Sequence, residues 1–71
     1  MLPSTPMNLT VNDNPLDFNG NTIADLLEQL EIRGRRLAVE VNREIVPKGE
    51  HETYKLEDGD RVEIVHAIGG G

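Results

Sequence analysis

The amino-acid sequence predicts an α+β fold in which one helix covers one face of a sheet of four to five strands. Several short stretches alternate apolar and polar residues with period two, which is typical of half-buried strands. One stretch repeats apolar residues at helical spacing instead and so presents a single apolar stripe. The last apolar stretch is almost unbroken, as in a strand at the middle of a sheet. A helix and a sheet with one apolar side each bury those sides by packing face to face.

The first two strands are predicted to form a hairpin. Residues 7–11 alternate apolar and polar side chains, and Leu16 and Phe18 repeat the inward pattern a few residues later. Residues 12–15, Asn-Asp-Asn-Pro, separate the two stretches. They are typical of a turn, because Asn and Asp tolerate the left-handed backbone conformation.

The single helix is expected to begin after Thr22. Thr22 precedes Asp25 by three residues, a weaker form of the capping box. The apolar stripe that follows consists of Ile23, Leu26, Leu27 and Leu30. Gly34 is expected to end the helix in the left-handed conformation, with three arginines close to the negative end of the helix dipole. These arginines are Arg33, Arg35 and Arg36.

Two further strands and a final one are expected after the helix. Residues 37–42 alternate in polarity, residues 42–44 form a turn, and a short strand at residues 45–46 ends at Pro47. The polar residues 48–53 are predicted to cross over with a turn of 3₁₀ helix.

The final strand is predicted at residues 61–67, in the middle of the sheet, because it is nearly continuous in apolar residues. A tight turn at residues 57–60 leads into it. Gly59 accepts the positive φ that this turn requires.

Composition limits the functions that the chain can have. A chain of 71 residues buries only about 60% of its unfolded surface, so a large internal active-site cleft is not expected. A formal net charge of −6 disfavours nucleic acid and anionic membranes, and favours a partner with a basic face. The absence of cysteine excludes disulfides, zinc–thiolate sites and a cysteine nucleophile. With no signal-peptide pattern or stretch of transmembrane length, a cytoplasmic protein is expected.

No residue pattern of the domain itself predicts catalysis or metal binding. His51 and His66 are the only histidines and lack the spacing of metal ligands. His66 lies near the end of the last strand, where it is either a surface residue or a contact for a partner. Five carboxylates on strands and turns are interpreted as surface charge rather than as an acid–base pair: Glu40, Glu44, Asp58, Asp60 and Glu63.

The chain ends in Gly69-Gly70-Gly71 directly after the apolar strand. Glycines lack Cβ atoms, so this segment can enter a channel too narrow for other residues and present its terminal carboxylate there. An ionised carboxylate attacks the α-phosphate of ATP if a partner enzyme aligns the two groups. Alternatively, the glycines are a frayed end or a remnant of cloning. Ile68 either completes the strand or anchors the base of the tail in a partner.

The chain resembles the ubiquitin-like β-grasp sulfur carriers, and most closely those of thiamine biosynthesis. The resemblance is carried by residues 42–47 (Asn-Arg-Glu-Ile-Val-Pro), by residues 56–65 around the Asp-Gly-Asp turn, and by the terminal diglycine Gly70-Gly71. It extends over residues 7–71. It implies a β-grasp fold with a mixed sheet and a flexible glycine tail.

The resemblance also implies a chemistry for the tail. Gly71 would be the group that an E1-like adenylyltransferase activates with ATP and that then becomes a thiocarboxylate. Sulfur would come from a donor such as a cysteine desulfurase, and thiazole synthase would consume it. Gly69 and Gly70 would thread into the partner sites, next to docking contacts at Ile68 and His66. The protein would then be a carrier and not an enzyme, and no cofactor or metal would be bound by this chain.

These expectations divide the chain into a disordered lead-in at residues 1–6, a β-grasp domain at residues 7–67 and a functional tail at residues 68–71. Two related functions remain open at this point. One is the sulfur carrier subunit of a molybdopterin-type synthase, and the other is a ubiquitin-like modifier that ends in an isopeptide bond to lysine. A purely structural binding module is the last alternative.

Overall fold

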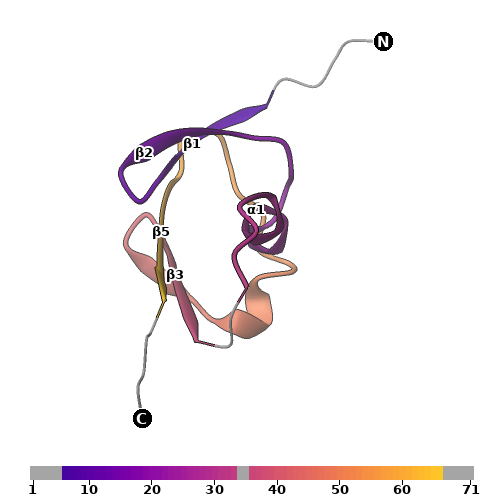
Figure 1. Ribbon diagram of the computed structural model, residues 1–71, viewed down its shortest axis with the longest axis vertical. Helices are drawn as coiled ribbons and strands as arrows, with labels where there is room; N and C mark the ends of the chain where they lie inside the picture. Colours follow the sequence, from indigo (N-terminus) through magenta and orange to yellow (C-terminus); the bar gives the residue numbers. More distant parts are fainter. Residues whose placement is uncertain (1–5, 34–35, 67–71) are drawn as a thin grey trace.

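The computed structural model describes residues 6–33 and 36–66. It contains a single five-stranded sheet in the order β2-β1-β5-β3-β4, with β1 and β5 parallel and the other neighbours antiparallel. Figure 1 shows the helix α1 on one side of this sheet. The elements are β1 (Met7–Val11), β2 (Asn14–Phe18), α1 (Ile23–Gln29), β3 (Leu37–Val41), β4 (Glu44–Val46), the 3₁₀ helix η1 (Lys48–Glu50) and β5 (Arg61–His66). The predicted α+β class and the central place of the last strand are both confirmed.

Both hairpins turn through two residues with positive φ. The values are 49° and 68° at Asn12 and Asp13, and 51° and 72° at Asn42 and Arg43. Two-residue turns of this kind match the twist of the strands that they join. The turns are therefore shorter than predicted, and the strands that follow them begin at once. Pro15 lies inside β2, where it is tolerated because β2 is at the edge of the sheet.

The helix begins as predicted but ends earlier. The Thr22 side chain and Asp25 form a reciprocal capping box at its start. At the other end Glu31 has a φ of 56°, and its amide donates to the Glu28 carbonyl at 3.0 Å. The next amide, that of Ile32, donates to the Leu27 carbonyl at 2.9 Å, which completes a Schellman motif.

The predicted helix end at Gly34 is therefore wrong, because Glu31 already occupies the left-handed position. The last turn of α1 contains no basic residue, so the predicted pairing of arginines with the helix dipole is also wrong. Arg33 and Arg36 follow the helix as exposed residues, and positions 34 and 35 lie outside the described residues.

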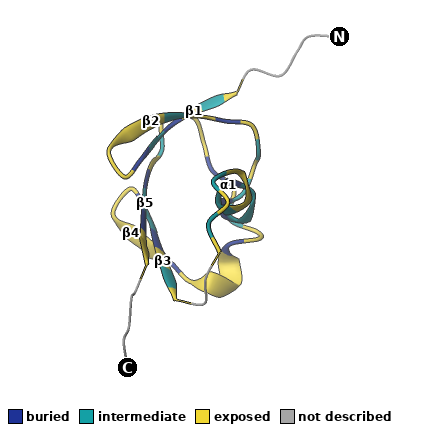
Figure 2. Ribbon diagram, viewed as in Figure 1, coloured by how far each residue is buried: buried dark blue, intermediate teal, exposed yellow. Residues whose placement is uncertain are grey.

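The core lies between α1 and the face of the sheet turned toward it (Figure 2). It is almost entirely aliphatic, and Phe18 is its one fully buried aromatic residue. The buried apolar residues are Leu9, Val11, Phe18, Ile23, Leu26, Val39, Val41, Val46, Leu56, Val62 and Ile64. Because β5 supplies two of them from the centre of the sheet, the last strand is anchored by the core.

Gly20 is required where β2 gives way to the helix. A Cβ atom at this position would lie 2.6 Å from the Asp25 Cβ and 2.7 Å from the Phe18 ring. We predict that Gly20→Ala lowers the free energy of unfolding by about 1–3 kcal/mol, because the ring or the helix must move. Gly49→Ala is the matched control, since a Cβ there meets nothing within 4 Å. Chemical denaturation of both variants tests this, and equal stabilities would contradict it.

The capping box makes stability depend on pH. The amides of Asn21 and Thr22 donate to the Asp25 carboxylate at 3.0 and 3.1 Å and hold its pKa below the ordinary value of 3.8. The stabilisation is therefore present above pH 3.8 and is lost as the pH falls through the lower pKa of the folded state.

We predict that Asp25→Asn reduces the loss of unfolding free energy between neutral pH and about pH 3. Denaturant titrations at the two pH values measure this difference. Glu28→Gln, which removes the same charge from the same helix, is the control. If the two variants changed the pH dependence equally, the capping contacts would not be its source.

Candidate functional site

The strand that carries the carboxyl end of the chain is held at the centre of the sheet. β5 pairs with β3 along its length, from Val62 opposite Val41 to His66 opposite Leu37. On its other side β5 pairs with β1 only at its first two residues, Arg61 and Val62. In Figure 1 β5 therefore continues along β3 after it has passed the β1–β2 hairpin. This strand is the platform from which the glycine tail follows.

Two asparagine side chains reach β5 from the two hairpin turns. The Asn12 side chain accepts a hydrogen bond from the Ile64 amide at 2.8 Å and donates to the Ile64 carbonyl at 3.2 Å. The Asn42 side chain accepts from the Arg61 amide at 3.0 Å and donates to the Asp60 carboxylate at 3.0 Å. The turns thus fix both the start and the second half of β5.

The outer face of the sheet, which is turned away from α1, is apolar close to the end of β5. Val65 is 57% exposed there and lies opposite Ala38 of β3. Ile45 of β4 is 71% exposed; it lies directly opposite Glu40 and diagonally across from Ala38. Ala38, Ile45 and Val65 form what is here called the apolar patch. Exposed apolar residues that gather in this way are typical of a protein contact surface.

Charged residues occupy the part of the outer face that is farther from the tail. Glu40 and Glu63 lie directly opposite each other on β3 and β5, and both are half-buried. With Arg43 and Arg61 they line a hollow of about 310 Å³. Arg61 also pairs with Asp13 of the first turn. These two glutamates lie on interior strands of the sheet and share the hollow with two arginines.

The predicted tail residues are only partly within the described structure. His66 is the last residue of β5 and is exposed. It pairs with Leu37, so it stands on the platform next to the start of the tail. Ile68, Gly69, Gly70 and Gly71 lie outside the described residues.

His51 has a structural role that the sequence does not reveal. It is only 6% exposed, and its Nε2 lies 3.1 Å from the Val46 carbonyl. Its own carbonyl accepts from the Ala24 amide at 2.9 Å. His51 therefore links the 3₁₀ segment to β4 and to the start of the helix. An isolated histidine in a polar stretch gives no signal for this position.

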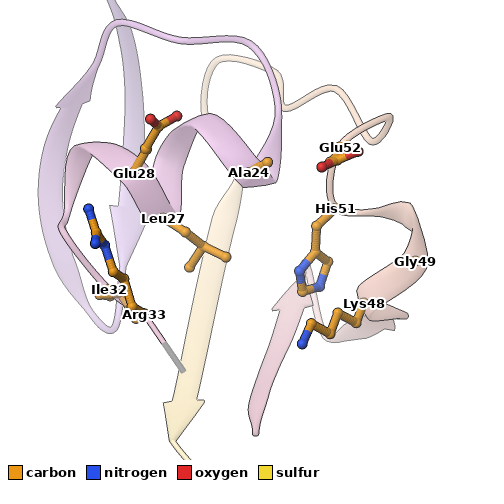
Figure 3. A pocket seen from close by; sticks show the side chains of 9 residues that line it. All are labelled: Ala24, Leu27, Glu28, Ile32, Arg33, Lys48, Gly49, His51 and Glu52. Carbon is orange, nitrogen blue, oxygen red and sulfur yellow. The ribbon is translucent and has the colours of Figure 1, made fainter. Parts of the chain in front are cut away.

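A shallow hollow of about 520 Å³ lies on the opposite side of the molecule from the outer face, between α1 and η1 (Figure 3). Leu27 and Ile32 contribute apolar surface to it. Acidic and basic side chains line it in equal number: Glu28, Glu52, Arg33 and Lys48. Among residues 6–33 and 36–66, no group of three or more His, Cys, Asp or Glu side chains is arranged to hold a metal ion. No described helix is long and apolar enough to cross a membrane.

The carboxylates near the last turn bind backbone groups. Asp58 accepts from the Asn8 amide at 2.7 Å, and Asp60 accepts from the Glu57 amide at 2.8 Å. Gly59 between them has a φ of 90°, as predicted for the tight turn. These two aspartates, interpreted from the sequence as surface charge, therefore also shape the entry into β5.

Comparison with known proteins places this structure in a family. The ThiS family model matches residues 5–71. The sulfur carrier protein ThiS of Escherichia coli is 33% identical, over 92% of this chain and 100% of its own length. A crystal structure of the thiamine biosynthesis protein ThiS from Geobacter metallireducens superposes with a TM-score of 0.79 at 33% identity, covering 92% of this chain and 100% of that one.

The chain is also similar to part of a larger enzyme. A thiazole synthase of Paramagnetospirillum magneticum is 42% identical over 92% of this chain, which corresponds to 20% of the enzyme's length. The chain thus spans about a fifth of that relative. Membership in the family implies partners of the ThiF and ThiG type.

The β-grasp topology, the central last strand and these similarities agree. The chain belongs to the ThiS family: it is a sulfur carrier of thiamine biosynthesis and not itself an enzyme.

Proposed function

We propose that the chain carries sulfur as a thiocarboxylate on Gly71. The Gly71 carboxylate attacks the α-phosphate of ATP in a partner's active site and displaces pyrophosphate. A persulfide of the sulfur donor then attacks the carbonyl carbon, and AMP leaves with one of the original carboxylate oxygens. A partner thiol attacks the donor's sulfur in the resulting acyl disulfide, so that the outer sulfur stays on the carbonyl as the thiocarboxylate and the two thiols are oxidised to a disulfide. ATP is thus bound by the partner and not by this chain. The observation that carries this proposal is the anchored β5 platform, whose last described residue precedes the tail by only a few positions.

The residues at the end of the chain have two roles: some enter the partner's active site, and others bind the partner's surface. Gly69 and Gly70 have no Cβ atoms, so they thread through a narrow channel that brings the Gly71 carboxylate to the nucleotide. Ile68 and His66 contact the partner at the entrance of that channel. In this division residues 7–67 form the domain, residues 68–71 form the functional tail, and residues 1–6 are a lead-in.

The apolar patch is the docking surface for the partners. Its three residues lie on one face of the sheet: Ala38 and Val65 pair next to the exposed end of β5, and Ile45 lies one step farther from that end, beside Glu40. A partner that covers the patch therefore also receives the tail. The net charge of −6 attracts a partner with a basic rim and speeds the encounter.

Three partners follow from this chemistry. An E1-like adenylyltransferase activates Gly71 with ATP, a donor such as a cysteine desulfurase supplies sulfur, and thiazole synthase uses the thiocarboxylate. The similarity to a segment of a thiazole synthase supports the last of these. The absence of cysteine fits a carrier that holds sulfur on carbon and acts in the reducing cytoplasm.

We predict that incubation with ATP, the adenylating partner and a sulfur donor raises the mass of the chain by the difference between sulfur and oxygen. Intact-mass spectrometry measures this change and fragmentation assigns it to Gly71. A variant that lacks Gly71 is the control and should keep its mass, because the carboxylate of Gly70 falls short of the nucleotide. Lysine conjugates in place of the exchange would indicate a protein modifier instead.

We predict that the double variant Ile45→Ser, Val65→Ser raises the KM for the carrier in the adenylation reaction by about tenfold, because two apolar side chains no longer pack against the partner. The kcat should remain unchanged, since the tail is intact. Both residues are exposed, so the unfolding free energy should change by no more than about 0.5 kcal/mol per site.

Thr10→Ser is the control for this variant. Thr10 lies on the same face but next to Arg61, away from the patch. Pyrophosphate release at varied carrier concentration gives both constants. A normal KM for the double variant would show that the partner docks elsewhere.

A further inference from the structure

β5 is longer than the strand that protects one of its edges. β1 pairs with β5 at Arg61 and Val62, and the chain then turns away at Asn12. β3 follows the other edge as far as His66. The second half of β5 is therefore flanked by a strand on one side only, and this half leads into the tail.

The Asn12 side chain takes the place of the missing strand. The Asn12 amide donates to the Val62 carbonyl at 2.9 Å, as a residue of a parallel strand would. Its side-chain amide then accepts from the Ile64 amide at 2.8 Å and donates to the Ile64 carbonyl at 3.2 Å. One residue thus extends the ladder of hydrogen bonds by a step beyond the end of β1.

The pairing pattern shows why Ile64 needs this partner. Neighbouring residues of a strand point their peptide groups toward opposite edges. The Asp60 carbonyl accepts from the Thr10 amide, and the Val62 carbonyl accepts from the Asn12 amide. The Ile64 amide and carbonyl point toward this same edge of β5. β3 therefore does not reach them, and the Ile64 side chain is 7% exposed. A peptide group left unpaired beside the core would be costly.

The turn between β3 and β4 contains a similar asparagine, Asn42, which contacts the start of β5 instead of its second half. Asn42 has a φ of 51°, close to the 49° of Asn12, and its backbone amide donates to the Arg61 carbonyl at 2.7 Å. Its side chain accepts from the Arg61 amide at 3.0 Å. Asn42 therefore holds the first residue of β5, whereas Asn12 holds a residue two positions before His66.

We propose that Asn12 is a positioning residue for the transfer reaction, because it fixes the direction in which the chain leaves the sheet. The proposal rests on the proposed function of the tail. A strand end held at both edges gives the tail one fixed origin, so fewer placements of the bound carrier are unproductive. If Ile64 is released, the end of β5 is held by β3 alone. More of the bound carriers then place the carboxylate away from the nucleotide.

The turn allows a substitution that removes only the side chain. Asn12 and Asn42 both have positive φ, which glycine adopts without strain, so Asn12→Gly and Asn42→Gly keep their turns. Each variant loses two hydrogen bonds made by a side-chain amide. The two variants are therefore matched in conformation and in the number of hydrogen bonds removed, and they differ in which part of β5 is released.

Hydrogen exchange is the first readout. We expect the Ile64 amide to exchange about tenfold faster in Asn12→Gly, as the removal of a hydrogen bond predicts, while the Arg61 amide is unchanged. The opposite result is expected for Asn42→Gly. Each amide is followed by NMR in the intact chain, and each variant is the control for the other. Unchanged exchange at Ile64 in Asn12→Gly would overturn the proposal.

Adenylation kinetics are the second readout, measured well below the unfolding temperature of all three proteins. We expect Asn12→Gly to lower kcat about fivefold at nearly unchanged KM, because the apolar patch is intact but fewer bound tails are aligned. Asn42→Gly should keep the wild-type kcat. Equal decreases in both variants, or none in either, would overturn the positioning role. A failure of the wild-type chain to be adenylated would instead refute the proposed function.

Discussion

The pairing of β5 on both sides is the constraint on which the rest of the structure depends. Parallel pairing with β1 requires a long connection between the two strands, and the helix and the second hairpin lie within it. Antiparallel pairing with β3 then places β5 in the middle of the sheet. The inward side chains of Val62 and Ile64 close the core from this position. The residues that precede the tail thereby belong to the central strand of the sheet.

The two faces of the sheet have separate tasks because the domain is small. One face and the helix form a single core that is almost entirely aliphatic. The outer face is free for a partner. Along β5 it changes from charged, at Arg61 and Glu63, to apolar, at Val65. For the chemistry proposed at Gly71, the domain needs little more than this. It needs a surface that a partner can recognise and a fixed origin for the tail.

The differences between prediction and structure have a common cause. The helix was expected to end at Gly34, but the chain leaves the helix at Glu31, because Ile32 packs against the core once Leu27 accepts its amide. His51 is buried because β4 and the helix meet at its position. At the helix end, the packing of Ile32 against the core outweighed the preference for glycine at the end of a helix. At His51, contacts with β4 and the helix outweighed the preference of histidine for the surface. Local patterns fail where the deciding partner is distant in the chain.

The sequence by itself determined the elements, the central place of the last strand and the family, because these depend on periodicity, turn residues and motifs that are local. Only the tertiary structure decided how the platform is built. The contact of Asn12 with Ile64 spans 52 positions, and the apolar patch combines three strands. Such contacts arise when the strands pair, and no short stretch of sequence contains both partners.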